Sequence, residues 1–386
     1  MISRKIRILT IGHSYVIALN RAIVREVARH PDFEVTVAAP SFVHGDLRDL
    51  VLEPEPAGSP LRVVSLNARW SRWIHVFHYH ARPLRLLIRQ NEFDLVHAWE
   101  EPFVYAGYQI ARSLAGLPVP FSFWTAQNLQ KHLPPPFRSF ECATLARAQG
   151  WIACGRLVYD TMRKRGYPAE RGRILTLAVD ATVFKPLDES QRTSVQGRLG
   201  LRPPVIGYTG RLTRDKGLHI LMQAMEQVGG ERPWSLLLLG GGPLERNILD
   251  WAKARGWGER VRIMLAKHDE VPAYLGAMDL LVAPSQTTWH WKEQFGRMLI
   301  EAFACGVPVI GSDSGEIPYV IGDAGRVVAE KDVVGWAAAI VELLDSPGQR
   351  ADLAQRGLSR CQEYAVTTLA EKYRGYYRWL AEQPVL

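Results

Sequence analysis

Short apolar runs alternate with longer amphipathic stretches along the whole chain. In the first half these runs are KIRILTIG, FEVTVAAP, FDLVHAW, PVPFSFWTA, GWIACG and RILTLAVD. In the second half they are PPVIGYTG, WSLLLLGGG, RVRIMLA, DLLVAPS and VPVIGSD. Strands that alternate with helices favour a parallel sheet covered by helices on both faces. The sequence therefore predicts an α/β fold of two facing, doubly wound, Rossmann-like domains.

The chain is long enough for two such domains. Its 386 residues, 47% of them apolar, correspond to two or three domains at roughly 100–200 residues each. Residues 186–204 are polar and rich in Pro and Gly, which is typical of a linker. We expect an N-terminal domain over residues 1–186, a C-terminal domain over residues 187–366, and a helical, aromatic end over residues 367–386.

The excess positive charge is concentrated in the first half. Residues 1–187 carry 24 Lys and Arg against 15 Asp and Glu, whereas residues 188–386 carry 23 against 24. A one-sided excess indicates that one domain meets something anionic, such as a membrane surface or a phosphorylated substrate. We expect no nucleic-acid partner, because no recognition element accompanies the charge.

No segment of the sequence predicts export or a membrane span. The apolar stretch before Gly12 is too short for the core of a signal peptide, and no later run approaches the roughly 18 apolar residues of a span. The four cysteines show no metal-ligand spacing. We expect a cytoplasmic protein with reduced cysteines, either in solution or peripheral at the inner face of the membrane.

The first candidate site follows the run PPVIGYTG. This run ends at Gly210, and two cations follow it, Arg211 and Lys216. In doubly wound sheets, ligands bind beyond the carboxyl ends of the strands. Arg offers a fork of donors and Lys a point charge, and both suit a diphosphate. A solvated loop fits the same residues, so both interpretations stay open at this stage.

The second candidate site lies in KEQFGRMLIEAFACGVPVIGSD. Glu293 precedes a predicted helix, and Glu301 lies inside it. Phe295, Gly296 and Arg297 would form the first helical turn, where N–H groups bind phosphate oxygens. A carboxylate further along the helix can accept the two hydroxyls of a ribose, and one in the preceding loop can reach sugar hydroxyls. A capping Glu and a solvated Glu fit the same pattern.

Other strand-end glycines carry weaker signals. Gly241 lies in a GGG stretch, for which a plain strand-to-helix turn is the simpler interpretation. Gly12 lies in the first such loop, but IGHSY lacks the other glycines of a dinucleotide-binding fingerprint. The sequence also has no HExxH motif and no Asp-x-Asp pair. We expect a site without a metal ion, in which protein cations neutralise a diphosphate.

Three motifs together resemble one known family. YTGRLTRDKG, LLGGGPL and EQFGRMLIEAFACGVPVIGSDSGEIP, in this order, resemble the retaining glycosyltransferases of family 4, which have the GT-B fold. The likeness is specific from about Pro204 to Ala329 and general in the first half. It implies a bacterial glycan or glycolipid glycosyltransferase, with a C-terminal helix that crosses back onto the first domain.

The resemblance also implies a reaction and the residues that perform it. A hexosyl group would pass from a nucleotide-diphosphate sugar, as co-substrate, to a hydroxyl of a glycan or lipid-linked acceptor with retention at the anomeric carbon, without a metal or a cofactor. Arg211 and Lys216 would bind the diphosphate, Glu293 the transferred sugar, and Glu301 the ribose hydroxyls. The other donor-side residues would be Phe295, Gly296, Arg297, Gly210, Gly241 and Lys267.

The first half departs from the family pattern at the acceptor end. Relatives carry a His after the strand that here reads PFSFWTAQN, and two glycines in the first loop. In this chain Trp124 stands at the first position, and His13 follows Gly12 at the second. The candidates to line the acceptor end are Gly12, His13, His97, Trp124 and Asn128. Each of them alone also has a purely structural interpretation.

The segment 68–90 is the most basic and aromatic part of the chain. It contains five arginines and three histidines, and Arg85 and Arg89 would share one face of a helix over residues 83–90. Family members that glycosylate lipid-linked acceptors touch the membrane with such a segment. We expect it to bind an anionic membrane surface or a lipid-linked diphosphate. A solvated helix that covers the sheet is the alternative.

Two other functions stay open. A nucleotide-sugar epimerase shares this fold, but it would need acid and base groups that act on the sugar ring, and the sequence shows no such set. A non-catalytic nucleotide-sugar binder is the second alternative, since Trp124 stands where relatives carry a His.

Overall fold

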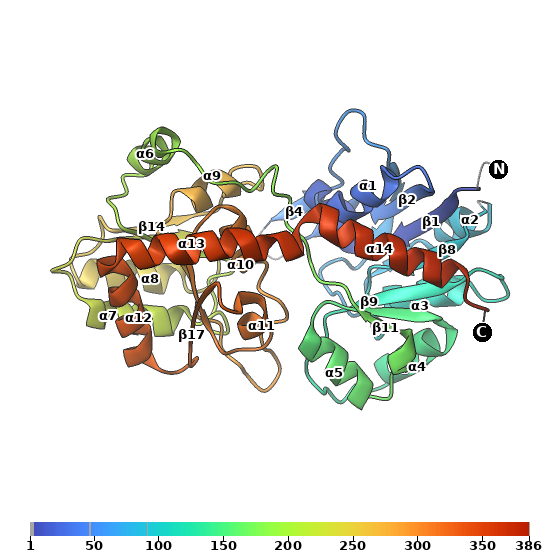
Figure 1. Cartoon of the computed structure of the whole chain (residues 1–386). Helices are drawn as coiled ribbons and strands as arrows, with labels where there is room; N and C mark the ends of the chain where they lie inside the picture. The colour runs from blue at the N-terminus through green and yellow to red at the C-terminus, as the bar shows by residue number, and fades with distance from the viewer. Residues whose placement is uncertain (1–3, 46–47, 91, 386) are drawn as a thin grey trace. The chain divides into compact units, whose positions relative to one another are not determined.

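The computed structural model describes residues 4–45, 48–90 and 92–385 (Figure 1). The chain forms two compact units. Unit 1 consists of Met1–Thr176 together with Val366–Leu386, and unit 2 consists of Leu177–Ala365. Residues 177–186, which the sequence analysis assigns to the first domain, group here with unit 2.

Unit 1 is built on a seven-stranded sheet in the order β11-β10-β9-β8-β1-β2-β5. All its strand pairs are parallel. The strands are β1 (Ile6–Ile11), β2 (Phe33–Pro40), β5 (Arg62–Leu66), β8 (Leu95–Ala98), β9 (Phe121–Thr125), β10 (Gly150–Ala153) and β11 (Gly172–Ile174). Two antiparallel hairpins are separate from it, β3 (Phe42–His44) with β4 (Asp49–Val51) and β6 (Ala68–Arg69) with β7 (His78–Tyr79).

Helices connect the strands of unit 1. The α-helices are α1 (Ala22–Ala28), α2 (Ala81–Gln90), α3 (Tyr105–Ser113), α4 (Phe137–Arg147), α5 (Arg156–Lys164) and α14 (Val366–Ala381). The short 3-10 helices are η1 (His13–Val16), η2 (Ala18–Arg21) and η3 (Ala169–Arg171).

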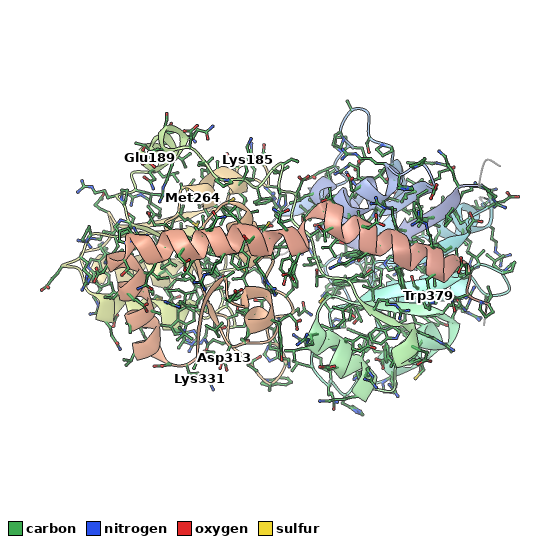
Figure 2. All side chains as sticks on the ribbon, viewed as in Figure 1. Lys185, Glu189, Met264, Asp313, Lys331 and Trp379 are labelled. Atoms are coloured by element: carbon green, nitrogen blue, oxygen red, sulfur yellow. The ribbon has the colours of Figure 1, made fainter. Side chains whose placement is uncertain are left out.

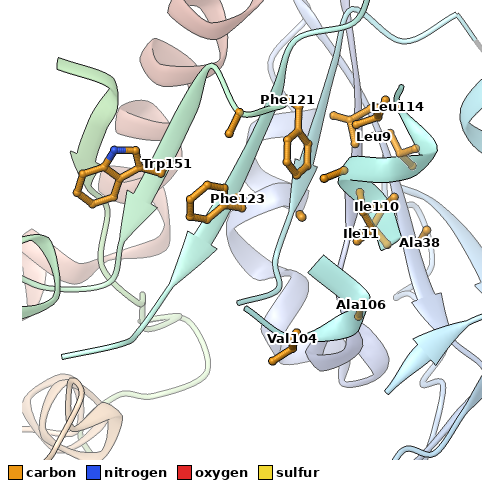
Figure 3. Packing of buried hydrophobic residues seen from close by; sticks show 14 of the residues in the cluster. Leu9, Ile11, Ala38, Val104, Ala106, Ile110, Leu114, Phe121, Phe123 and Trp151 are labelled. Atoms are coloured by element: carbon orange, nitrogen blue, oxygen red, sulfur yellow. The ribbon is translucent and has the colours of Figure 1, made fainter. Parts of the chain in front are cut away.

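The strand register gives the sheet of unit 1 two different faces. Phe121 and Phe123 point to one face, where they pack in an apolar cluster with Ile11 and with Ile110 of α3 (Figure 3). Both phenylalanines are fully buried, and each such side chain contributes about 1.5–3 kcal/mol to folding. Because side chains alternate along a strand, the residue between them, Ser122, points to the opposite face.

Helix α14 packs on unit 1 (Figure 1). Tyr373 stacks on Trp99, with ring centres 6.3 Å apart. The Arg173 guanidinium lies 4.7 Å from the ring centre of Trp379, a residue of this helix that Figure 2 labels. Arg378 donates to Asp32 at 2.8 Å. The end of the chain is therefore held to the first unit by aromatic and ionic contacts along the helix.

Unit 2 repeats the architecture with six parallel strands in the order β14-β13-β12-β15-β16-β17. They are β12 (Val205–Thr209), β13 (Ser235–Leu239), β14 (Val261–Met264), β15 (Leu280–Ala283), β16 (Val309–Ser312) and β17 (Gly325–Val328). The helices are α6 (Glu189–Arg198), α7 (Leu218–Val228), α8 (Glu245–Ala254), α9 (Val271–Gly276), α10 (Arg297–Ala304), α11 (Ile317–Ile321), α12 (Val333–Asp345), α13 (Pro347–Cys361) and the 3-10 helix η4 (Gln362–Tyr364).

The predicted α/β class and the predicted parallel pairing are confirmed. Ten of the eleven apolar runs contain a strand, and the run RILTLAVD holds only the last two residues of β11. Strands β5 and β17, at the edges of the two sheets, and the hairpin strands β3, β4, β6 and β7 lie outside the predicted runs. The side chains of β5 and β17 are largely exposed or half-buried, so neither of these two edge strands shows the continuous apolar run of a central strand.

The expectation of a linker over residues 186–204 is wrong. Residues 189–198 form α6, whose N-terminus has a capping box between Asp188 and Gln191. Val195 and Gln196 are buried, and Gln196 Nε2 donates to the Ala277 carbonyl at 2.9 Å. Polar composition is misleading here because the helix packs on unit 2 through only two buried side chains.

Replacing Asp188 by Ala should lower the stability of unit 2. The Asp188 carboxylate accepts a hydrogen bond from the Gln191 N–H at 2.8 Å, and loss of such a cap costs about 1 kcal/mol. Urea unfolding would measure the change. Ser194→Ala, an exposed position in the same helix, is the control; equal costs for both variants would contradict the capping role.

Candidate functional site

The loop after β12 carries the two predicted cations of the donor side. Gly210 and Arg211 follow the strand directly, and Lys216 precedes Gly217, the N-cap of α7. Gly217 has φ +76°, and a Cβ there would lie 1.7 Å from the Pro284 carbonyl oxygen. Glycine therefore lets this loop lie against the residues that follow β15.

Lys216 and Glu293 form the centre of a largely buried polar cluster. Lys216 Nζ lies 2.7 Å from Glu293 Oε2, and the two side chains are 12% and 8% exposed. Ser285 Oγ donates to the same carboxylate oxygen at 2.8 Å. Nζ also lies 4.3 Å from the centre of the Trp291 ring. The ammonium group has three protons, so it can hold Glu293 and still donate to a phosphate oxygen.

The loop that holds Glu293 is fixed by contacts that the sequence analysis does not identify. Thr287 Oγ1 and Ser314 Oγ share a hydrogen bond of 3.0 Å. Gly315 has φ +59°, and a Cβ there would lie 1.9 Å from the Glu293 carbonyl oxygen. The loops after β15 and β16 are therefore held against each other by a hydrogen bond and by close backbone packing. The small polar residues in SDSG, directly after a predicted strand, are the signal that points to this contact.

A helix follows Glu293, but α10 begins at Arg297, two residues later than the predicted first turn of Phe295, Gly296 and Arg297. Gly296 is the N-cap residue and has φ +86°. Phe295 is buried and packs edge-on against the Tyr364 ring, with centres 5.7 Å apart. Arg297 begins the helix. The positive end of the helix dipole at this turn favours an anion.

Glu301 lies in the middle of α10 and is desolvated. Burial raises the pKa of its carboxyl to about 7, against the opposing positive charge of Arg297. A carboxyl with this pKa is largely ionised only above neutrality. Hydroxyl donors of a ligand would stabilise its charged form and lower the pKa again.

The remaining donor-side candidates lie in neighbouring loops. Arg211 Nη2 lies 3.7 Å from Asp215 Oδ2, and its side chain is 43% exposed. The Gly241 carbonyl accepts from the Leu212 N–H at 2.9 Å, which joins the β13 end to the β12 end. Lys267 is exposed in the loop between β14 and α9. Within the described residues, no group of three or more His, Cys, Asp or Glu is arranged to hold a metal ion.

At the carboxyl edge of the sheet of unit 1, His13 meets Glu100. The backbone N–H and the Nδ1 of His13 each lie 2.7 Å from an oxygen of this carboxylate. Tyr79 Oη donates to it at 3.1 Å. A Cβ on Gly12 would lie 2.8 Å from the Trp99 Cβ, so the missing side chain lets the loop after β1 approach the residues after β8.

A second carboxyl lies beside Glu100. Glu101 accepts hydrogen bonds from Thr125 Oγ1 at 2.6 Å and from the Ala126 N–H at 2.7 Å. Burial raises the pKa of the Glu101 carboxyl to about 7 against these bonds. Neither glutamate is among the site residues predicted from the sequence. Two consecutive acidic residues directly after FDLVHAW are the signal that identifies them.

Two of the acceptor-side candidates are buried. His97 is fully buried within β8, and its Nδ1 lies 2.8 Å from Ser122 Oγ. Asn128 is only 3% exposed, and its carbonyl accepts from Thr161 Oγ1 at 3.3 Å. His97 points to the face that α14 covers, where its ring centre lies 6.0 Å from that of Tyr377.

Trp124 lies within β9 and not in the loop that follows it. Its side chain packs on the face of the sheet that α14 covers. It stacks on Trp99 with ring centres 5.1 Å apart and an angle of 11°, and Trp99 in turn stacks on Tyr373 of α14. Trp124 is half-buried. Of the five acceptor-side candidates, Gly12 and His13 follow β1 and Asn128 follows β9, at the strand ends where ligands bind in this class of fold.

Two family models match the chain. "Glycosyl transferases group 1" matches residues 190–360, and "Glycosyltransferase Family 4" matches residues 18–183. The chain belongs to this family of glycosyltransferases.

The curated relatives match part of their length. A D-inositol 3-phosphate glycosyltransferase from Corynebacterium urealyticum is 29% identical over 236 residues, which are 57% of this chain and 54% of that protein. A GDP-mannose-dependent monoacylated alpha-(1-6)-phosphatidylinositol monomannoside mannosyltransferase from Corynebacterium glutamicum is 33% identical over 189 residues, 47% and 49% of the two chains. The chain thus spans about half the length of the curated relatives it matches.

Solved structures agree in fold over nearly the whole chain. HepE from Anabaena in complex with UDP has a TM-score of 0.74 at 18% identity and covers 97% of this chain and 100% of its own. Sucrose-phosphate synthase from Thermosynechococcus elongatus has a TM-score of 0.75 at 20% identity, with coverages of 98% and 99%. These neighbours confirm the GT-B fold class.

The burial of His97 predicts a pH-dependent stability. Burial lowers the pKa of this imidazole from 6.5 to about 3. As the pH falls below 6.5, the imidazole of the unfolded chain takes up a proton while that of the folded chain stays neutral. His97 therefore lowers the free energy of unfolding in this pH range. The free energy of unfolding of the wild type relative to His97→Gln should fall by about 2 kcal/mol between pH 7 and pH 5.

Denaturant titrations at both pH values would measure this difference. Val96→Ala, the preceding buried residue on the opposite face, is the control and should cost the same at both pH values. A His97→Gln cost that is independent of pH would contradict the neutral, buried state of His97.

Proposed function

We propose that this protein is a retaining, metal-independent hexosyltransferase. It moves a sugar from a nucleotide-diphosphate sugar to a hydroxyl of a polysaccharide or glycolipid precursor. The observation that carries the proposal is the Lys216–Glu293 pair at the carboxyl edge of the unit 2 sheet, 2.7 Å apart and shielded from water. Family membership supports it.

The roles follow from the chemistry of each group. Lys216 and Arg211 neutralise the diphosphate, so that the nucleotide leaves as a stabilised anion and the reaction needs no metal ion. Glu293, whose loop is interlocked with that of Ser314, accepts hydroxyls of the transferred sugar. Glu301 accepts the ribose hydroxyls. The N–H groups at the start of α10 donate to the phosphates.

Names of relatives support the substrate classes. HepE was crystallised with UDP and with UDP-glucose. The two corynebacterial relatives are named for acceptors that carry a phosphate, inositol 3-phosphate and a phosphatidylinositol mannoside. The excess of cations in residues 1–187 suits an acceptor of this kind.

A thermal-shift screen tests the proposal. UDP-, GDP- and ADP-sugars are added with EDTA present, since a ligand that binds the native state raises its melting temperature. We expect one nucleotide class to stabilise the protein. The protein should also release sugar from that donor. NMR of the transfer product should show an α-linkage when the donor is an α-linked sugar.

Each failure has its own meaning. Absence of any shift with and without Mg²⁺ refutes donor binding. A shift without sugar release indicates a non-catalytic binder. Stabilisation that requires Mg²⁺ refutes metal independence, and an inverted product refutes retention.

Replacing Glu301 by Ala should weaken nucleotide binding while the fold survives. Hydrogen bonds to a charged group contribute about 1.5–3 kcal/mol, which corresponds to a roughly 10- to 100-fold higher Kd. Isothermal titration with the free nucleoside diphosphate would measure it. Glu231→Ala, at an exposed position of unit 2, should leave the Kd unchanged; an unchanged Kd in Glu301→Ala would refute the role of Glu301.

We also propose that residues 68–90 bind an anionic membrane surface, where a lipid-linked acceptor resides. Trp70 and Trp73 are 59% and 62% exposed, and Ile74 and Leu86 are also exposed. All five arginines of the segment are exposed. Trp70 has φ +58°, a rare conformation for a bulky residue that often marks functional sites. No described helix is long and apolar enough to cross a membrane.

The double variant Trp70→Ser/Trp73→Ser should bind anionic vesicles at least fivefold more weakly than the wild type. Exposed Trp side chains insert at the headgroup level, and the arginines attract anionic lipid. Co-sedimentation with phosphatidylglycerol and with phosphatidylcholine vesicles would measure binding. Trp289→Ser removes a 92% exposed Trp of unit 2 and is the control. Equal binding of the wild type to both kinds of vesicle would contradict the proposal.

A further inference from the structure

An aromatic ring lies against the central cation of the donor side, and the roles proposed above leave this ring unused. Lys216 Nζ lies 4.3 Å from the centre of the Trp291 ring and 2.7 Å from Glu293 Oε2. Trp291 is half-buried and lies two residues before Glu293, in the loop that precedes α10. The ammonium group therefore contacts a carboxylate and an aromatic ring at the same time.

The backbone of Trp291 is fixed by a short turn. Its N–H donates to Thr288 Oγ1 at 3.0 Å, and its carbonyl accepts from the Thr288 N–H at 2.7 Å. The N–H of the preceding Thr287 donates to Glu330 at 2.6 Å, and the Thr287 hydroxyl bonds to Ser314 Oγ at 3.0 Å. The loop that carries the ring is therefore anchored to the loops that follow β16 and β17.

The loop that carries Lys216 is bonded to the same segment. The Gln286 N–H donates to the Asp215 carbonyl at 2.8 Å. Because the backbone is fixed on both sides of the contact, the remaining freedom is that of the Lys216 side chain, a flexible four-carbon stem. The Trp291 ring limits the positions that the ammonium group can adopt.

Another Trp–cation contact of unit 2 shows what differs here. The Arg260 guanidinium lies 5.1 Å from the centre of the Trp234 ring and donates to two backbone carbonyls at 2.8 Å each. That contact is structural, because the fold supplies the partners of the cation. Within the part of the chain that the structure describes, the Lys216 ammonium makes one hydrogen bond, to Glu293. Its other protons can therefore reach a phosphate oxygen.

We propose that Trp291 is a positioning residue of the donor site, which holds the Lys216 ammonium where it meets the diphosphate of the donor. This inference rests on the proposed binding of a nucleotide sugar and adds a residue to it. The face of an indole ring attracts a cation, so Trp291 holds the ammonium without using any of its protons. An aliphatic side chain at this position would exclude water but would not attract the charge.

The charge of the ligand gives the inference a specific consequence. At pH 8, UDP carries about one negative charge more than UDP-glucose, because a terminal phosphate loses a second proton with a pKa of about 6. A well-placed ammonium group gains more from the ligand of larger charge. Trp291 should therefore contribute more to the binding of a nucleoside diphosphate than to that of a nucleotide sugar.

The test measures the Kd of UDP, UDP-glucose, GDP and GDP-mannose by isothermal titration of the full chain at pH 8. We expect Trp291→Leu to raise the Kd of the nucleoside diphosphate by about 5- to 30-fold and that of the nucleotide sugar by less. Trp291→Phe keeps an aromatic face and should give an intermediate Kd. Trp289→Leu removes an almost fully exposed Trp of the same loop; it is the matched control and should leave the Kd unchanged.

A double-mutant cycle tests whether Trp291 acts through Lys216. Lys216→Gln removes the charge and keeps a hydrogen-bond donor for Glu293. In this background, Trp291→Leu should raise the Kd of the nucleoside diphosphate less than twofold. Losses that multiply in the double variant overturn the inference. Where Lys216→Gln fails to fold, the comparison of Phe with Leu at position 291 decides.

Two results of the single variants also overturn the inference. The first is a folded Trp291→Leu protein whose Kd for the nucleoside diphosphate lies within twofold of the wild type. The second is a Trp291→Phe protein that binds no better than Trp291→Leu, because the aromatic face then has no role.

The proposed function can fail separately. A wild type that binds none of the four ligands refutes donor binding. NMR then still tests the contact, because the ring current of Trp291 shifts the ε-methylene protons of Lys216 upfield. We expect these protons to move downfield in Trp291→Leu and to keep their position in Trp289→Leu. An unchanged position in both variants overturns the inference.

Discussion

Parallel pairing of the strands in both large sheets is the constraint on which the rest of the structure depends. Parallel strands all end at the same edge of the sheet, so every loop that follows a strand meets its neighbours there. His13 after β1 meets Glu100 after β8, and Lys216 after β12 meets Glu293 after β15. Residues that are 87 and 77 positions apart in the sequence become partners in this way.

Each of these partnerships combines a cationic or basic group with a desolvated carboxylate. A carboxylate taken out of water is stable only when it is paired and hydrogen-bonded. Glu293 satisfies this requirement with Lys216 and Ser285, and Glu100 satisfies it with His13 and Tyr79. The hydrogen bonds that satisfy each carboxylate also hold its side chain and those of its partners in fixed positions. Rigid, preorganised charge is what transfer of a sugar between oxygen atoms needs.

The positions at which the sequence analysis fails have a common physical cause. A shift of one or two positions along a strand changes where a side chain lies. A residue inside the strand packs in the interior, and a residue just after the strand lies in a loop at the edge of the sheet. His97 and Trp124 belong to strands and, by alternation, point to the face that α14 covers, while Glu100 and Glu101 lie just after β8 and reach the edge. Composition is equally ambiguous in residues 186–204, where a polar segment folds into α6 because two of its side chains have a surface to pack on.

The sequence by itself determined the α/β class and the strands with apolar runs, because apolar periodicity is a local property; the order of its motifs predicted the residues of the donor side. The partners of those residues were decided by the tertiary structure. The contacts of Lys216 with Trp291, of Glu293 with the loop of Gly315, and of His13 with Glu100 all join loops from different strands. The formation of the edge strands and of helix α6 likewise depends on the surface against which each segment packs. The same holds for the burial of His97. Burial and pairing are properties of the packed fold, and no local pattern encodes them.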